Sequence, residues 1–146
     1  MNNDNVQVPA SFDSLSSIRT YVMQAASAAG LEHKRAYRLQ LAVDEIATNV
    51  VTHGGGSEQP DAYIRVSHEI TDECLTIVLE DNSHPFDPTQ QTLASDINAP
   101  LEERPIGGLG VYLALKNVDT FTYKYANQHN RNILVMYRQT PPPETQ

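Results

Sequence analysis

The stretch LQLAVDEIATNVVTHGGG, residues 39–56, decides the fold and holds the first candidate site residues. Its apolar residues recur three or four positions apart, which is the spacing of one face of a helix. They are Leu39, Ala42, Val43, Ile46, Ala47 and Val50. A run of three glycines follows and is a typical stop signal for a helix. We therefore predict a helix from about residue 34 to residue 52, with this apolar stripe buried.

Glu45, Asn49 and His53 are spaced four residues apart, so on a helix they share one face, beside the apolar stripe. The carboxamide oxygen of Asn49 suits Mg²⁺, which prefers oxygen ligands and shares them with substrate phosphates. One turn earlier, Glu45 could accept a proton from an attacking hydroxyl or water. The alternative is a solvated polar edge on an amphipathic helix. His53 is better interpreted as a C-terminal cap or dipole partner than as a catalyst.

A second candidate group follows the apolar segment CLTIVLE, residues 74–80, in the sequence DNSHPFDP, residues 81–88. Asp81 ends the predicted strand, where its carboxylate could accept a hydrogen bond from an exocyclic amino group such as that of adenine. The alternative is a turn, since Asp-Asn-Ser is common turn chemistry. Phe86 either covers a bound base or anchors the loop in the core.

A third candidate group lies in IGGLGVYLALKNVD, residues 106–119, where the segment Gly107, Gly108, Leu109, Gly110 opens a predicted helix. Glycines at a helix N-terminus let backbone N–H groups approach anionic oxygens, which suits a di- or triphosphate. The alternative is tight packing, because the pattern is neither the Walker phosphate loop nor the Rossmann fingerprint. Arg104, just before it, is either a phosphate contact or an exposed arginine of the preceding loop.

The remaining sequence predicts alternating helices and strands around a lid. The expected elements are a strand at 6–9, a helix capped by Ser14 or Ser16 and ending at Gly30, strands at 62–70 and 74–80 forming a hairpin, a mobile lid at about 82–105, a helix at 107–118, and strands at 120–125 and 133–138. This order predicts an α+β two-layer sandwich, with a mixed, mostly antiparallel sheet and helices on one face. We expect a single domain over residues 1–139 and a disordered Pro-rich tail at 140–146.

Composition narrows the classes of partner. The 146 residues carry 10 basic and 18 acidic side chains, a net charge of −8, which disfavours binding to nucleic acid or anionic lipid. Cys74 is the only cysteine, so neither an internal disulfide nor a cysteine metal cluster is expected. The sequence has no secretion signal and no apolar segment long enough to cross a membrane. We therefore expect a cytoplasmic protein.

Taken together, LAVDEIATNVVTHG, DNSHPFDP and GGLGVYLALKNVD resemble the N, G1 and G2 boxes of the GHKL (histidine-kinase-like) ATPase superfamily. Within it, the sequence is most similar to the anti-sigma-factor serine/threonine kinase branch, over nearly the whole chain. The resemblance implies a Bergerat-type ATP-binding fold with ATP and Mg²⁺ as cofactors. It gives Glu45 the role of catalytic base, Asn49 that of magnesium ligand, Asp81 that of adenine contact, and Gly108 and Gly110 that of phosphate lid.

The resemblance further implies a protein kinase that phosphorylates a serine on a small anti-sigma-factor antagonist of the STAS type, in a partner-switching pathway that also involves a sigma factor. Whether the chain forms a homodimer is left open. Ser83 departs from the family pattern, which has glycine in Asp-x-Gly, and its side chain approaches the expected position of the base. The alternative function is therefore a catalytically weak or inactive nucleotide-sensing module that binds a protein partner.

Overall fold

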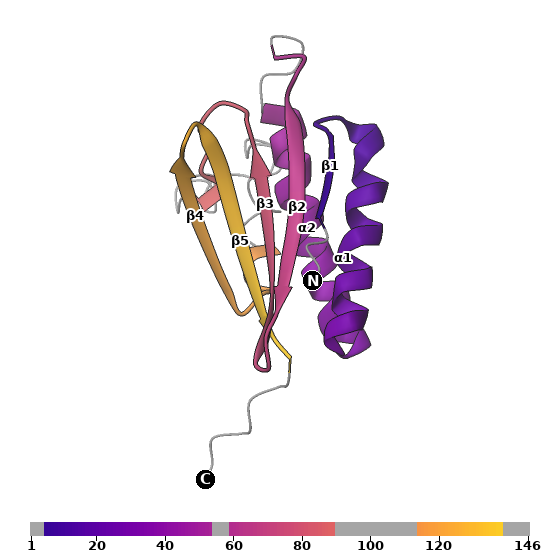
Figure 1. The fold of residues 1–146 in the computed structure, drawn as a ribbon. Helices are drawn as coiled ribbons and strands as arrows, with labels where there is room; N and C mark the ends of the chain where they lie inside the picture. The colour runs from indigo at the N-terminus through magenta and orange to yellow at the C-terminus, as the bar shows by residue number, and fades with distance from the viewer. Residues whose placement is uncertain (1–4, 54–58, 90–113, 139–146) are drawn as a thin grey trace, which may run out of the picture.

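The computed structural model describes residues 5–53, 59–89 and 114–138, which form a five-stranded sheet backed by two long helices (Figure 1). The elements are β1 (Asn5–Pro9), a 3₁₀ turn (Phe12–Ser14), α1 (Leu15–Ala29), α2 (His33–His53), β2 (Tyr63–Ile70), β3 (Cys74–Asp81), β4 (Thr120–Ala126) and β5 (His129–Tyr137). The predicted hairpin of β2 and β3 is confirmed.

The strands follow the order β1-β2-β3-β5-β4, and every neighbouring pair is antiparallel. Both helices lie against the same face of this sheet, as Figure 1 shows. The predicted two-layer α+β sandwich is confirmed, and the described sheet is entirely antiparallel. β3 and β5 pair at the centre, with Asp81 opposite Asn130 at one end of the ladder.

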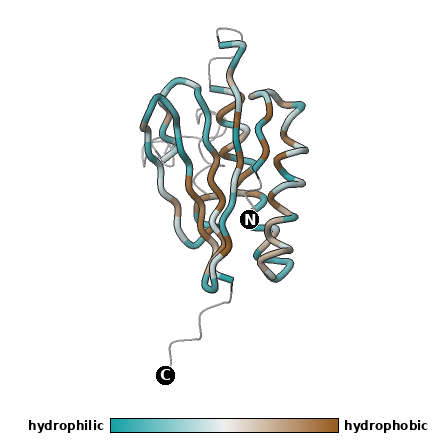
Figure 2. Tube along the Cα trace, viewed as in Figure 1, coloured by the Kyte–Doolittle hydropathy of each residue, from teal (hydrophilic) through white to brown (hydrophobic). Residues whose placement is uncertain are grey.

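The core lies between the sheet and the helices because each element turns one apolar face inward. On β2 and β3, alternate side chains are buried, as the period of a strand requires. Figure 2 shows the corresponding apolar segments along the central strands and the helices. The apolar stripe predicted for α2 is buried, and Leu39, Ile46 and Ala47 are at most 1% exposed.

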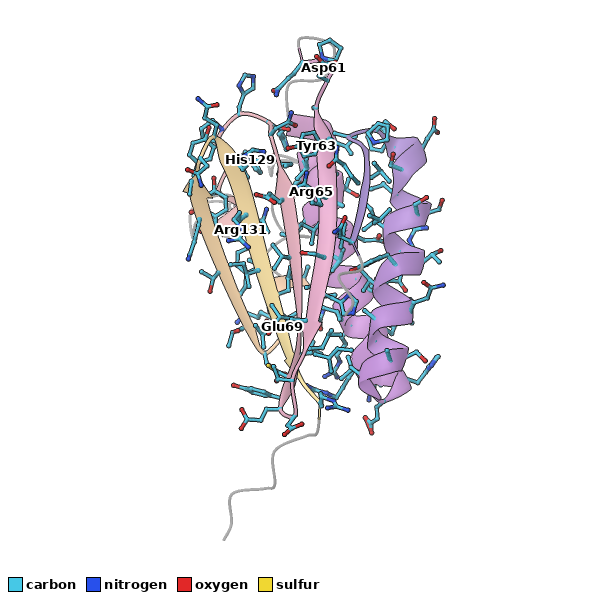
Figure 3. All side chains as sticks on the ribbon, in the orientation of Figure 1. Asp61, Tyr63, Arg65, Glu69, His129 and Arg131 are labelled. Carbon is cyan, nitrogen blue, oxygen red and sulfur yellow. The ribbon has the colours of Figure 1, made fainter. Side chains whose placement is uncertain are left out.

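The other face of the sheet carries no helix in the described part of the chain, and polar side chains gather on it. Figure 3 labels Tyr63, Arg65 and Glu69 of β2 and His129 and Arg131 of β5 on this face. The Tyr63 hydroxyl and His129 Nε2 are 2.7 Å apart and share a hydrogen bond. Alternation along the strands thus separates this outer face, on which Val78, Ile133 and Val135 also lie, from the buried face that the helices cover.

α1 ends where the sequence predicted, because Gly30 takes the left-handed conformation, with φ of 75°. Its N–H bonds the carbonyl oxygen of Ser27 at 3.0 Å. At the other end, Ser14 occupies the N-cap position, but its hydroxyl makes no capping hydrogen bond. The predicted boundary is therefore right, and the predicted side-chain cap is not observed.

Two predicted boundaries were wrong. β5 begins at His129, four residues before the predicted start, because Asn127 and Gln128 both have positive φ and close a two-residue hairpin with β4. The predicted helix at 107–118 ends at Leu115 rather than Val118. There the N–H of Asn117 bonds the carbonyl oxygen of Ala114 at 2.9 Å, a tightening common in a last helical turn. The start of that helix, the lid beyond residue 89 and the C-terminal tail lie outside the described residues.

Candidate functional site

A narrow cavity lies between α2, the end of β3 and the start of β5. Its polar lining comes from all three elements and from the segment after β3. These residues are Asn49, His53, Asp81, Ser83, His84, Asn130 and Asn132. The fold thus brings together Asn49 and Asp81, two of the predicted site residues that lie far apart in the sequence. The space inside is about 10 Å³, which is room for about one water molecule.

Asn49 faces this cavity from α2 and is buried, with 6% of its surface exposed. Its Nδ2 has no hydrogen-bond partner. A buried amide donor without a partner costs free energy, so such groups call for a specific explanation. Because Asn49 belongs to the same helix as the buried stripe, its neighbours Ile46 and Val50 hold it at the cavity wall.

Asp81 is 1% exposed at the end of β3 and is held by a network centred on Asn130 of β5. Asn130 Nδ2 donates to Asp81 Oδ1 over 3.0 Å, and the Ser83 N–H donates to the same oxygen over 3.0 Å. The second carboxylate oxygen, Oδ2, is buried without a partner. One oxygen therefore fixes the side chain, and the other remains available to a donor in the cavity.

Burial raises the pKa of Asp81 above its usual value, since desolvation disfavours the charged carboxylate. The hydrogen bonds from Asn130 and from the backbone of Ser83 oppose this rise by stabilising the ionised form. The nearby Ser83 hydroxyl also lowers the pKa, although its Oγ makes no hydrogen bond of regular geometry. The ionised Asp81 carboxylate therefore destabilises the folded protein unless a ligand donates a hydrogen bond to it.

Glu45 lies one turn before Asn49 on α2, is half-buried, and does not line the cavity. Its pKa is raised, first by partial burial and second by the negative charge of the neighbouring Asp44. Asp44 itself pairs with Arg19 of α1, with Nε 3.1 Å from Oδ2. A carboxylate with a raised pKa is a better proton acceptor than an ordinary surface glutamate.

The rings of Phe86 and His53 stack at the cavity wall, with centroids 4.9 Å apart and planes 16° apart. Phe86 is half-buried, lies outside the main apolar cluster, and donates its backbone N–H to Asn130 Oδ1 over 2.9 Å. Phe86 thus lines the cavity, and its role as a cover over a bound base stays a prediction. His53, the last residue of α2, forms part of the same wall.

Two residues of the cavity lining were not predicted from the sequence: Asn130 and Asn132, both 2% exposed. They occupy inward positions of β5, where the next inward residues are Leu134 and Met136. A signal for them exists in the sequence, because asparagine at inward positions of a strand must find polar partners. The late predicted start of this strand hid that signal.

Several predicted residues lie outside the described part of the chain: Arg104, Gly107, Gly108, Leu109 and Gly110. Their assignment as a phosphate-binding segment stays a prediction. Within residues 5–53, 59–89 and 114–138, no group of three or more His, Cys, Asp or Glu side chains could hold a metal ion. Asn49 is the predicted metal ligand that the structure places at the cavity.

The chain matches the histidine kinase-like ATPase domain family over residues 8–138 and belongs to that family. A serine-protein kinase RsbW from Listeria monocytogenes is 32% identical over 111 residues, which cover 74% of this chain and 70% of that protein. An RsbW from Staphylococcus aureus is 30% identical over 122 residues, covering 80% and 76%. The resemblance to the anti-sigma-factor serine kinase branch is thereby confirmed.

Two solved structures share the fold. The RsbU and RsbW domains of a Mycobacterium tuberculosis protein give a TM-score of 0.67 at 13% identity, over 97% of this chain and 34% of that chain. The histidine kinase domain of a blue-light activated kinase from Erythrobacter litoralis gives 0.53 at 13% identity, over 94% of this chain and 64% of that chain. At such identity, these similarities concern the fold alone. No helix among the described residues is long and apolar enough to cross a membrane.

Proposed function

We propose that this chain is a Mg²⁺-dependent ATP-binding protein kinase that phosphorylates a serine on a STAS-type anti-sigma-factor antagonist. One observation carries the proposal. Four side-chain atoms at the wall of one cavity are buried without partners: Asn49 Nδ2, Asp81 Oδ2, Ser83 Oγ and Asn132 Oδ1. Each costs about 1–3 kcal/mol in that state, so together they favour a site whose polar groups are satisfied by a ligand.

The residues at the cavity fit an adenine nucleotide. Asp81 Oδ2 is an acceptor for an exocyclic amino group, and its position is fixed through Oδ1. The Asn49 carboxamide carries both N–H donors and an oxygen, and half a turn about its last bond exchanges them. It can therefore present oxygen to Mg²⁺, which when bound would neutralise phosphate charge and orient the phosphates.

In this proposal Glu45 acts as the general base. Its partial burial and the charge of Asp44 raise its pKa, which suits a general base. Glu45 takes the proton of the partner's serine hydroxyl, whose oxygen bonds to the γ-phosphorus while the bond to the β–γ bridging oxygen breaks and ADP leaves. The acceptor serine would approach beside Asn49, because Glu45 lies one helical turn away on the same face.

The partners in this proposal follow from the names of the relatives and from the sequence resemblance. The similar proteins are called serine-protein kinases. The sequence resemblance implies an antagonist protein and a sigma factor as partners of this branch. We extend both partners to this chain, which would make it a regulator of transcription by partner switching. A homodimer remains an open alternative.

Transfer of labelled phosphate tests the proposal. The purified chain is incubated with γ-labelled ATP, Mg²⁺ and the STAS-type antagonist of its host. Label should appear on the antagonist, and Glu45→Gln should lower the rate by about 10²–10⁴-fold because proton acceptance is lost. ADP affinity should be unchanged, since Glu45 is not part of the cavity wall.

Glu73→Gln is the matched control, because Glu73 is an exposed carboxylate in the turn between β2 and β3. This variant should label the antagonist at the wild-type rate. Equal labelling by Glu45→Gln would remove Glu45 from the mechanism. Binding of ADP without any labelling by the wild type would instead support the second function, a nucleotide-sensing module. The absence of Glu45 from the cavity wall favours that alternative.

A further inference from the structure

Ser83 is a buried serine whose hydroxyl makes no hydrogen bond of regular geometry. It is 5% exposed and lines the same cavity as Asp81, whose Oδ2 is also buried and unpartnered. A small residue without a hydroxyl would avoid the cost of burying this group, which is about 1–3 kcal/mol. The hydroxyl therefore calls for an explanation in terms of a ligand.

Hydrogen bonds fix Asp81 and Ser83 relative to each other at the cavity wall. The Ser83 N–H donates to Asp81 Oδ1 over 3.0 Å, and Asn130 Nδ2 donates both to that oxygen and to the Ser83 carbonyl oxygen, the latter over 3.3 Å. This network occupies Oδ1 and fixes the segment. It leaves Oδ2 and the Ser83 Oγ as the unpaired polar pair at this part of the cavity wall.

The chemistry of the pair is specific. An ionised carboxylate oxygen only accepts hydrogen bonds, whereas a serine hydroxyl can donate one. A 6-aminopurine presents the complementary edge, with the N6 amino donor next to the N1 acceptor. In the same ring placement, a 6-oxopurine would put its O6 acceptor against the carboxylate and its N1–H against the hydroxyl.

We propose that Ser83 is a specificity-determining residue. Its hydroxyl donates a hydrogen bond to N1 of an adenine base, while Asp81 Oδ2 accepts a hydrogen bond from the N6 amino group. The inference rests on the proposed function, because it requires an adenine nucleotide in this cavity. A glycine at this position has no side chain, so N1 would have to be bonded by the backbone or by solvent. The Ser83 hydroxyl bonds N1 directly in this proposal.

Entry of the base requires a change in the cavity wall, which has room for about one water molecule. The stacked rings of Phe86 and His53 form part of this wall, so in this proposal they move aside for the base. Asp81 and Ser83 need not move, since Asn130 holds both. Asp81 Oδ2 and the Ser83 hydroxyl are therefore in position before the nucleotide binds. Such preorganisation lowers the free-energy cost of binding.

Calorimetric titration of three Mg²⁺ complexes tests the inference: ADP, 1-deaza-ADP, which lacks the N1 acceptor, and 7-deaza-ADP, which keeps the N1 and N6 edge. The wild type should bind ADP and 7-deaza-ADP alike and 1-deaza-ADP about tenfold more weakly. Ser83→Ala should bind ADP about tenfold more weakly than the wild type does and should no longer distinguish 1-deaza-ADP. Ser27→Ala, at an exposed serine of α1, should behave as the wild type.

Thermal unfolding without nucleotide separates a binding role from a structural one. The Tm of Ser83→Ala should stay close to that of the wild type, because the hydroxyl makes no hydrogen bond of regular geometry and only assists the Asp81 carboxylate. Equal ADP affinity in Ser83→Ala and the wild type would overturn the inference while leaving the proposed function standing. An equal loss of affinity for ADP and 1-deaza-ADP would also overturn it. No binding of ADP by the wild type would overturn both.

Discussion

Asn130 of β5 lies opposite Asp81 of β3 and donates a hydrogen bond from Nδ2 to Asp81 Oδ1 over 3.0 Å. The same carboxamide has four further partners, in the segment after β3 and on β4: the carbonyl oxygens of Ser83 and His84, the N–H of Phe86 and the hydroxyl of Tyr123. Asn130 therefore positions both the candidate base-reading carboxylate and the segment that covers it.

Replacing Asn130 should impair both stability and binding. Asn130→Ala removes all five hydrogen bonds and leaves buried groups unpaired, so we expect the free energy of unfolding to fall by about 3 kcal/mol. Nucleotide affinity should fall by at least about tenfold because Asp81 is no longer held. Urea unfolding and calorimetric titration measure the two effects.

Tyr123→Phe is the graded control for this change. It removes one hydrogen bond to Asn130 and keeps the other four, so its cost should be about 1 kcal/mol. ADP affinity should stay within about twofold of wild type. If Asn130→Ala were no more destabilising than Tyr123→Phe, the central place of Asn130 in the network would be wrong.

Asp81→Asn should stabilise the nucleotide-free protein at neutral pH. The folded-state pKa of Asp81 is raised by burial, so it lies above the unfolded value of about 3.8. Between those two values the folded state binds more protons, and wild-type stability falls as pH rises. The variant removes this penalty and should be more stable by about 1 kcal/mol at pH 7, or about 3 °C in Tm.

The stability gain of Asp81→Asn should shrink as the pH falls toward the unfolded pKa of the aspartate, because the wild-type carboxyl then becomes neutral too. Thermal unfolding at a series of pH values without nucleotide measures the difference. Asp61→Asn, at an exposed carboxylate, should show no such trend. A gain that is constant or grows toward acid pH would contradict the buried-charge explanation. ADP binding by Asp81→Asn should be lost at every pH, since an amino donor would lose its anionic acceptor.

Asn49→Ala should separate magnesium dependence from folding. If the Asn49 oxygen ligates Mg²⁺, the wild type should bind ATP more tightly with Mg²⁺ than with chelator. The increase in ATP affinity that Mg²⁺ produces should be at least about tenfold smaller in the variant. The free energy of unfolding should change by less than about 1 kcal/mol, because Nδ2 has no protein partner. Titrations of ATP with Mg²⁺ and with chelator provide the comparison, and Thr48→Ala on the same helix is the control. An unchanged Mg²⁺ effect would reject Asn49 as the ligand.

Gly30→Ala should destabilise the junction between the two helices. Gly30 has φ of 75°, and a Cβ there would meet no atom within 4 Å, so the cost is backbone strain alone. We expect about 1 kcal/mol, measured by urea unfolding. Gly30→Asn should cost less, because asparagine tolerates this conformation better than alanine does. Equal costs for the two variants would point to something other than the left-handed backbone.

The sequence by itself determined the elements of this protein, because each carries a local period. The helical stripe of α2, the alternation in β2 and β3 and the stop at Gly30 follow from three- to four-residue and two-residue spacings and from a single backbone conformation. The order of the elements then fixed the two-layer sandwich, and the three boxes fixed the family.

Only the tertiary structure decided the details of the site, because these depend on contacts between segments far apart in the chain. It placed Asn49 and Asp81 at one cavity and kept Glu45 outside its wall. It also set Asn130 against Asp81, a pairing that follows from the strand register and not from any local pattern. Burial by the whole fold then left Asp81 Oδ2 and Ser83 Oγ without partners, and no spacing in the sequence encodes that state.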